Sequence, residues 1–156
     1  MSKAAFLAAV RDELKAQITE VAGRVFVVVQ DAQGNQLLPK EAACPFLTVA
    51  DGGREMVGET QLPGMATQRV TVRAYVQNAR DCEAPILGHA ASGELGAAAL
   101  QDAIAAALQG NLLASRISGV VLAEVERLPA VDYLADESWF AVIGDVSVRY
   151  ECGGTA

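Results

Sequence analysis

The sequence is poor in the side chains that most often take part in catalysis or bind metals. It has one histidine, His89, only 5% aromatic residues, and three cysteines, Cys44, Cys82 and Cys152, with no CxxC pair. A zinc site needs several cysteine or histidine ligands at short spacing, and a disulfide framework needs a denser, even-numbered set of cysteines. The sequence therefore predicts neither, and we expect no metal or other cofactor.

Long apolar runs and an excess of positive charge are also missing. The alanine-rich stretch 92–109 is interrupted by Gln101 and Asp102, and the apolar run 4–10 is followed at once by Arg11, so neither can span a bilayer. No signal peptide is evident. A net charge of −7 argues against a protein that grips nucleic-acid phosphates or an anionic membrane. We expect folding in a cytoplasm, without membrane or specific nucleic-acid binding.

What is present is a long alanine-rich stretch, Ser92 to Gln109, which predicts a helix. Ser92 is expected to accept hydrogen bonds from the first-turn amides, and Gly110–Asn111 to end the helix. An apolar stripe at helical spacing is expected to lie on a sheet and comprises Ala97, Leu100, Ile104 and Leu108. The other side is small, so we predict that Ala98 and Ala105 meet a neighbouring subunit. The alternative, that the alanines only raise helix propensity, stays open.

The remaining elements are predicted to be one further helix and a series of short strands. Residues Ser2 to Val21 form the helix, with Phe6, Val10, Leu14 and Ile18 on one face. Strands are predicted at 24–30, 45–50, 68–77, 119–128 and 139–151, with 54–60 as a hairpin partner across the turn 51–53. The stretches 78–91 and 131–137 are predicted loops.

Most of these strands alternate between apolar and polar residues. In 68–77, one face carries Val70, Val72, Ala74 and Val76, and the other carries Arg69, Thr71, Arg73, Tyr75 and Gln77. In the two later strands, the inward residues are Val121, Ala123 and Val125, then Phe140, Val142, Val146, Val148 and Tyr150. One buried and one polar face suit an antiparallel or mixed sheet with helices on one side.

We therefore predict a single α+β domain over residues 1–152, followed by a flexible tail at 153–156. Its elements follow the order α-β-β-(β)-β-α-β-β, with a mixed, mostly antiparallel sheet and two main helices packed on it. At 156 residues the chain is long enough for one domain with a sizeable core.

A catalytic site can be written down from the sequence, but little supports it. His89 lies near Asp81, Cys82 and Ser92, which allows a Ser-His-Asp or Cys-His arrangement on paper. The sequence has no GxSxG nucleophile elbow and no phosphate-binding GK[ST]. Glu124 and Glu126 share a strand face, but paired carboxylates beside arginines are more often a salt-bridged surface. We therefore predict no catalytic residues and no enzymatic activity.

Charged side chains on the polar strand faces are instead candidate contact residues. Mixed charge of this kind suits a surface that pairs with a neighbour's complementary charges, or simply a soluble exterior. With the two alanines of the helix, the candidate oligomer or partner interface comprises Arg69, Arg73, Ala98, Ala105, Glu124, Glu126, Asp145 and Arg149.

The order and texture of these elements resemble the tail terminator (tail completion) proteins of long-tailed bacteriophages and prophages. The likeness is carried by the helix SKAAFLAAVRDELKAQI, the strands CPFLTVADG and QRVTVRAYVQ, the helix GELGAAALQDAIAAAL and the closing strand SWFAVIGDVSVRYE. The resemblance implies an α+β fold and a ring, typically hexameric, that caps the finished tail tube and receives the head-completion protein. It implies no catalytic motif, a lumen through which DNA passes, and a place in the virion tail after assembly in the host bacterial cytoplasm.

Three classes of function therefore compete. The favoured one is a structural phage or prophage ring protein, whose partners are its own copies, the tail tube protein and a head-completion or connector protein. A head–tail connector or neck protein of the same architecture is its nearest variant. The second class is a cytoplasmic small-ligand or peptide-binding module, which the loops 31–46 and 78–91 allow. The third is a small hydrolase that uses Cys82 or Ser92 with His89.

Overall fold

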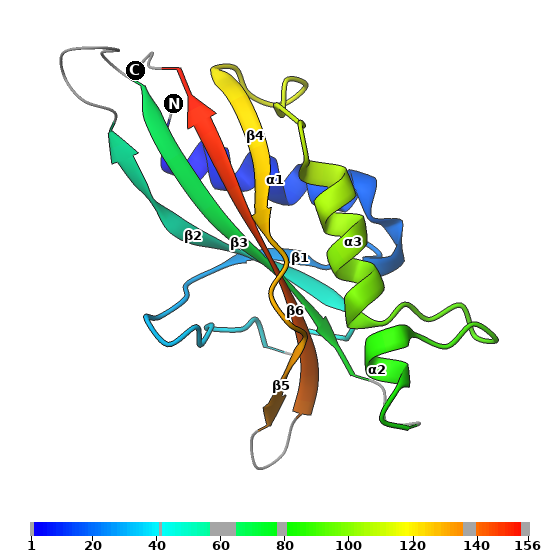
Figure 1. The fold of residues 1–156 in the computed structure, drawn as a ribbon. Coiled ribbons are helices and arrows are strands. Elements are labelled where there is room, and N and C mark those ends of the chain that lie inside the picture. The colour runs from blue at the N-terminus through cyan, green and yellow to red at the C-terminus, as the bar shows by residue number, and fades with distance from the viewer. Residues whose placement is uncertain (1, 41, 57–64, 78–80, 136–139, 154–156) are drawn as a thin grey trace.

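One sheet of six strands forms the body of the protein (Figure 1), whose computed structural model describes residues 2–40, 42–56, 65–77, 81–135 and 140–153. The strands are β1 (Val25–Val28), β2 (Phe46–Met56), β3 (Ala66–Val76), β4 (Val120–Arg127), β5 (Asp132–Ala135) and β6 (Phe140–Cys152). Their order is β1-β2-β3-β6-β4, and β5 pairs with the other end of β6. Among the strand pairs that the structure describes, only β1 and β2 run parallel, so the predicted α+β class with a mostly antiparallel sheet is confirmed.

Helices cover one face of this sheet. They are α1 (Lys3–Gln17), the 3-10 turn η1 (Thr19–Val21), the short α2 (Ala84–Leu87) and α3 (Ala97–Leu108). In Figure 1, α1 and α3 lie on the same side of the sheet, and both contribute to one apolar core. That core includes the predicted helix stripes, namely Phe6, Val10, Leu14 and Ile18 of the first helical segment and Ala97, Leu100, Ile104 and Leu108 of α3. The apolar periodicity of both helices is therefore confirmed.

The first helix begins where predicted but ends four residues before the predicted Val21. Ser2 is its N-cap, because the Ser2 Oγ accepts a hydrogen bond from the Ala5 amide at 3.1 Å. The helix stops at Gln17, and the chain continues through η1 to Val21. The Phe6 ring meets the Tyr150 ring edge-on at 4.9 Å, which ties α1 to the middle of the sheet.

The predicted hairpin at 51–53 is wrong, because β2 runs straight through this stretch. The register with β3 shifts between Asp51 and Arg54, which is a β-bulge rather than a turn. Gly53 has φ +99°, and its amide donates to the Asp51 carboxylate at 2.9 Å. The buried Gln68 donates to the same carboxylate at 2.9 Å, so the bulge is held by its partner strand. The rest of the predicted segment, 57–60, lies outside the described residues.

The alanine-rich helix begins four residues later than predicted, since Ser92 was the predicted N-cap. Its N-cap is Gly96, and Ser92 instead lies in a turn in which the His89 amide donates to the Glu94 carbonyl. A Cβ at Gly96 would lie 2.1 Å from the Ile86 carbonyl oxygen, so only glycine lets α2 pass this close to the start of α3. The predicted loop 78–91 thus contains α2, while residues 78–80 lie outside the described part.

Two further expectations about strands are corrected. The predicted loop 131–137 contains β5, which pairs with the first residues of β6. Val121 was expected to face inward but is 58% exposed, whereas Val120 is buried. The reason is a register shift between Val120 and Leu122, which rotates the start of β4 relative to β6. Trp139, the predicted first residue of the last strand, lies outside the described residues.

Candidate interaction surfaces

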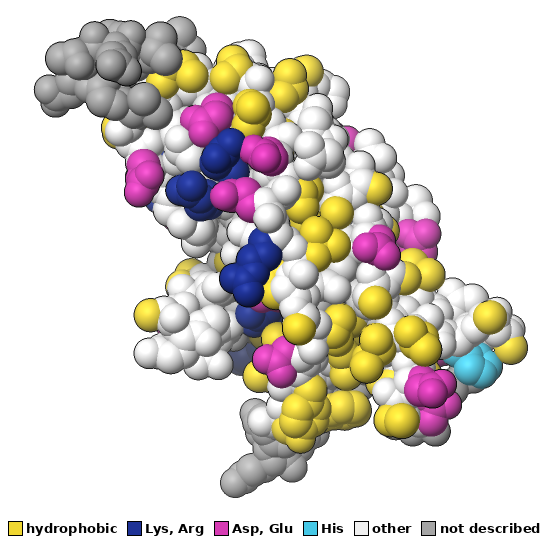
Figure 2. All heavy atoms as spheres, in the orientation of Figure 1, with side chains coloured by type: hydrophobic (Ala, Val, Ile, Leu, Met, Phe, Trp, Pro, Cys, Tyr) yellow, Lys and Arg dark blue, Asp and Glu magenta, His cyan; other side chains and the backbone are white. Residues whose placement is uncertain are grey.

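Four of the predicted interface residues form ion pairs with one another on the open face of the sheet, opposite the helices. Arg69 and Arg149 are direct cross-strand neighbours, which by itself would be repulsive. Arg69 Nε lies 3.2 Å from Glu126 Oε1, and Arg149 Nη2 lies 2.6 Å from Glu124 Oε2. Basic and acidic side chains accordingly alternate in the upper half of Figure 2. The sequence correctly grouped these four residues, but their charges are largely balanced within one chain.

Two more of the predicted residues, Arg73 and Asp145, form a separate and much less exposed pair. The guanidinium of Arg73 binds the Asp145 carboxylate through two hydrogen bonds, of 2.7 and 3.1 Å. A third hydrogen bond runs from Arg73 Nη1 to the Gly34 carbonyl at 2.8 Å. Burial alone lowers the pKa of Arg73, but its bonds to Asp145 and Tyr75 outweigh this and raise the pKa above its usual value. Arg73 therefore stays charged in place.

Arg73 and Tyr75 belong to the strand face that was predicted to be polar, but both are buried. They are 5% and 0% exposed, because the open face is covered here by a segment we call the covering loop, residues 29–45 apart from residue 41. A second apolar cluster lies beneath it and comprises Phe46, Tyr75, Ala141 and Ile143, with Phe26, Leu38, Ala42, Cys44 and Leu134 packed against them. The Tyr75 hydroxyl and Thr48 Oγ1 both donate to Gln36 Oε1, which anchors the loop.

The two alanines predicted to meet a neighbour are only partly available. Ala98 and Ala105 are both half-buried, and Ala105 packs against the core of its own chain. Ala106 is exposed and lies on the outer side of α3. A tryptophan at Ala105 would therefore disturb the core as well as any interface, so Ala106 is the better place to probe this helix face.

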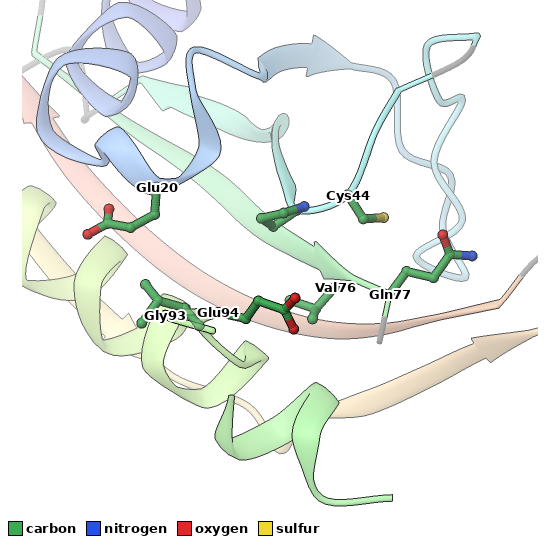
Figure 3. A pocket seen from close by; sticks show the side chains of 8 residues that line it. Glu20, Cys44, Val76, Gln77, Gly93 and Glu94 are labelled. Atoms are coloured by element: carbon green, nitrogen blue, oxygen red, sulfur yellow. The ribbon is translucent and has the colours of Figure 1, made fainter. Parts of the chain in front are cut away.

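A cleft of about 230 Å³ opens beside the end of β3, on the helix side of the sheet. Four segments far apart in the sequence form it: η1, the turn with the cis Cys44–Pro45 bond, the end of β3, and the turn before α3. Its lining consists of Glu20, Cys44, Pro45, Val76, Gln77, Gly93, Glu94 and Leu95. In Figure 3, Glu20 projects from η1 and Glu94 projects from the turn before α3 toward Val76, so the two carboxylates point in different directions.

The charged side chains that line the cleft are those of Glu20 and Glu94. Burial raises the pKa of the Cys44 thiol, and the nearby Arg24 only partly offsets this increase. Cys44 therefore lines the cleft with an uncharged thiol at physiological pH. The cleft was not predicted from the sequence. No motif marks it, because each segment contributes only one to three residues and nothing in their spacing brings them together.

The hydrolase arrangement written from the sequence is present only in part. His89 Nδ1 lies 3.0 Å from Ser92 Oγ, but these residues are three apart in one exposed turn. The Asp81 Oδ1 atom accepts hydrogen bonds from the Glu83 and Ala84 amides at the start of α2. A triad needs the third group to orient the histidine. The prediction that the chain is not an enzyme stays a prediction.

Two general features of the described residues bear on ligands. Among them, no group of three or more His, Cys, Asp or Glu side chains is placed to hold a metal ion. None of the helices in the described ranges is both long enough and apolar enough to cross a membrane.

Comparison with known proteins identifies a similar fold. No protein-family model matches the chain, and no curated protein matches it by sequence. A chain in a solved structure titled "Virion of native gene transfer agent (GTA) particle" superimposes with a TM-score of 0.56 at 18% sequence identity. The match covers 95% of this chain and 94% of that chain, so the two share one fold from end to end.

Proposed function

We propose that this protein is a structural component of a phage-like virion, and specifically a tail terminator that forms a ring on the finished tail tube. The observation that carries the proposal is the end-to-end likeness to a chain of a gene transfer agent virion. Such a likeness in fold alone is compatible with many functions. The proposal is strengthened by the sequence, because the order and residue patterns of its helices and strands, from the first helix to the last strand, independently resemble the tail terminator family.

Electrostatics support a role in which DNA passes by without being held. The chain carries 19 acidic and 12 basic residues. The arginines of the open face are paired with Glu124, Glu126 and Asp145, so they are not available to collect phosphates. An acidic ring would let the duplex slide through its lumen, and would keep free subunits soluble until the tube offers a complementary rim.

The test is to delete the gene from the genome that carries it and to image the resulting particles. A tail terminator stops tube growth and receives the head, so its loss should give tubes of uncontrolled length without heads. Complementation with the wild-type gene should restore tails of uniform length joined to heads.

Other outcomes separate the alternatives. Tails of normal length that lack heads would favour the head–tail connector or neck variant. Normal infectious particles would refute a virion role and return attention to the ligand-binding module.

A further inference from the structure

Two aliphatic side chains lie next to each other on the first part of the covering loop. Val29 and Leu37 are 72% and 76% exposed, and the Leu37 amide donates to the Val29 carbonyl at 3.0 Å. We call residues 29–37 the loop hairpin. Single exposed apolar residues are ordinary, whereas adjacent ones are more often part of an interaction surface. Lys40 follows the loop hairpin at an exposed position.

The loop hairpin is held in place by contacts within its own chain. At its turn, the Asp31 carboxylate accepts hydrogen bonds from the Gln33 and Asn35 amides at 2.9 Å. On the side that faces the sheet, the Gly34 carbonyl accepts a hydrogen bond from the buried Arg73 at 2.8 Å. A partner that binds here therefore pays little conformational entropy for ordering the segment.

A second exposed apolar pair lies on α2. Ile86 and Leu87 are 38% and 69% exposed, and Glu83, the N-cap residue of this helix, is also exposed. In Figure 1, α2 lies beside the start of α3 at the lower right, whereas the chain after β1 projects at the left. The two apolar pairs therefore lie on different sides of the molecule.

The surfaces around these two pairs carry opposite charge. Lys40 follows one pair and Glu83 precedes the other, and neither side chain has an ion pair with any residue that the structure describes. Asp102 of α3 is exposed as well, and Figure 2 shows acidic side chains but no basic ones over the described parts of α2 and α3. A chain of net charge −7 repels its own copies at long range, so a contact between copies needs such a local pairing of opposite charges.

We propose that the loop hairpin of one copy packs on the exposed side of α2 in a second copy. Leu37 meets Leu87 in this contact, and Lys40 pairs with Glu83. A contact between two different surfaces is heterologous, and repeating it in one direction produces a closed ring or a filament. The contact rests on the proposed function only in that it supplies the repeating contact such a ring needs.

The experiment is sedimentation velocity of the full chain over a concentration series at moderate salt. Wild type should associate beyond a dimer. L37D and L87D should each sediment as monomers, because a charge at the centre of an apolar contact weakens it by roughly 30-fold or more. M56D is the matched control, since Met56 is 67% exposed at the far end of β2, and it should associate like wild type. Circular dichroism of every variant shows whether a loss of assembly is a loss of folding.

An equal mixture of L37D and L87D provides the decisive result. The L87D chain keeps an intact loop hairpin and the L37D chain keeps an intact α2, so only one contact can form between them. The mixture should give a one-to-one complex that does not grow further.

The charge pair is tested by reversal within one chain. K40E and E83K should each weaken association by roughly 5-fold, because like charges then meet. The chain with both changes joins opposite charges again at every contact and should associate like wild type. K15E changes the net charge as K40E does, but lies on α1, and should have no such effect.

Several results would overturn the proposal. They are wild type that stays monomeric at high concentration, L37D or L87D that assembles like wild type, and M56D that fails to assemble. A mixture that stays monomeric, or a K40E/E83K chain no better than the single reversals, would overturn it as well. None of these results affects the gene-deletion test, so the two proposals fail separately.

Discussion

The buried pair of Arg73 and Asp145 allows a sharp prediction about stability. Changing Asp145 to alanine removes the carboxylate but leaves its backbone carbonyl, which accepts a hydrogen bond from Gln101. The Arg73 guanidinium is then left beneath the covering loop with the Gly34 carbonyl and, at 3.4 Å, the Tyr75 hydroxyl. Breaking a buried ion pair on one side typically costs about 3–5 kcal/mol, because a charge is left without its partner.

The side-chain exposures place the expected value near the lower limit of that range. Arg73 keeps 7% of its side chain exposed and Asp145 keeps 24%, so water can reach part of the vacated site. We expect Asp145→Ala to lower the free energy of unfolding by about 3 kcal/mol. For a chain of this size, that corresponds to a fall in Tm of roughly 6–12 °C.

The assay is urea denaturation followed by circular dichroism, with Glu126→Ala as the matched control. Glu126 pairs with Arg69, but these side chains are 31% and 40% exposed, and exposed pairs contribute less than about 1 kcal/mol. Adding Arg73→Met to Asp145→Ala should recover about 1 kcal/mol, because the stranded charge is gone. If Asp145→Ala costs no more than Glu126→Ala, or if the double variant is the least stable, the reasoning is refuted.

Three further outcomes are expected. Val72→Asp places a charge at a fully buried core position and should cost several kcal/mol, enough to abolish the folded circular dichroism spectrum, whereas Val121→Asp, at an exposed position, should not. The pKa of Glu13 is lowered by its hydrogen bonds from Gln17 and Arg116, although burial opposes this. The ionised Glu13 therefore contributes its full stabilisation above about pH 4.5, the ordinary pKa of this group, and this contribution is lost as the pH falls below that value. Glu13→Gln should lower the free energy of unfolding by about 1.5 kcal/mol at pH 7 and flatten the acid limb of a stability–pH curve. Finally, a labelled DNA duplex should show no change in fluorescence anisotropy with the wild-type chain even at low salt, and tight, salt-sensitive binding would contradict a passive lumen.

The amino-acid sequence by itself determined which residues form the main core. Phe6, Val10, Leu14 and Ile18 recur at helical spacing, and Val70, Val72, Ala74 and Val76 alternate along a strand. Such periodicities follow from backbone geometry alone, so they assign one face of each element without knowledge of its neighbours. The α+β class and the grouping of charged residues on the open face follow from the same pattern.

Boundaries were predicted less well, because they depend on contacts between elements. Asp51–Gly53 has the composition of a turn, but β3 holds these residues in a bulge by means of the buried Gln68. Ser92 has the composition of an N-cap, but the close passage of α2 sets the start of α3 at Gly96. In both places tertiary packing outweighs a local preference.

Only the tertiary structure decided which polar faces meet water and where a cleft opens. Alternation showed that Arg73 and Tyr75 point away from the helices, but not that the covering loop buries them. Likewise, Glu20 and Glu94 are 74 positions apart in the sequence and line the same cleft only because η1 and the turn before α3 flank the end of β3. The physical reason is that periodicity reports the direction of a side chain relative to its own backbone, whereas burial depends on whatever long-range segment packs against it.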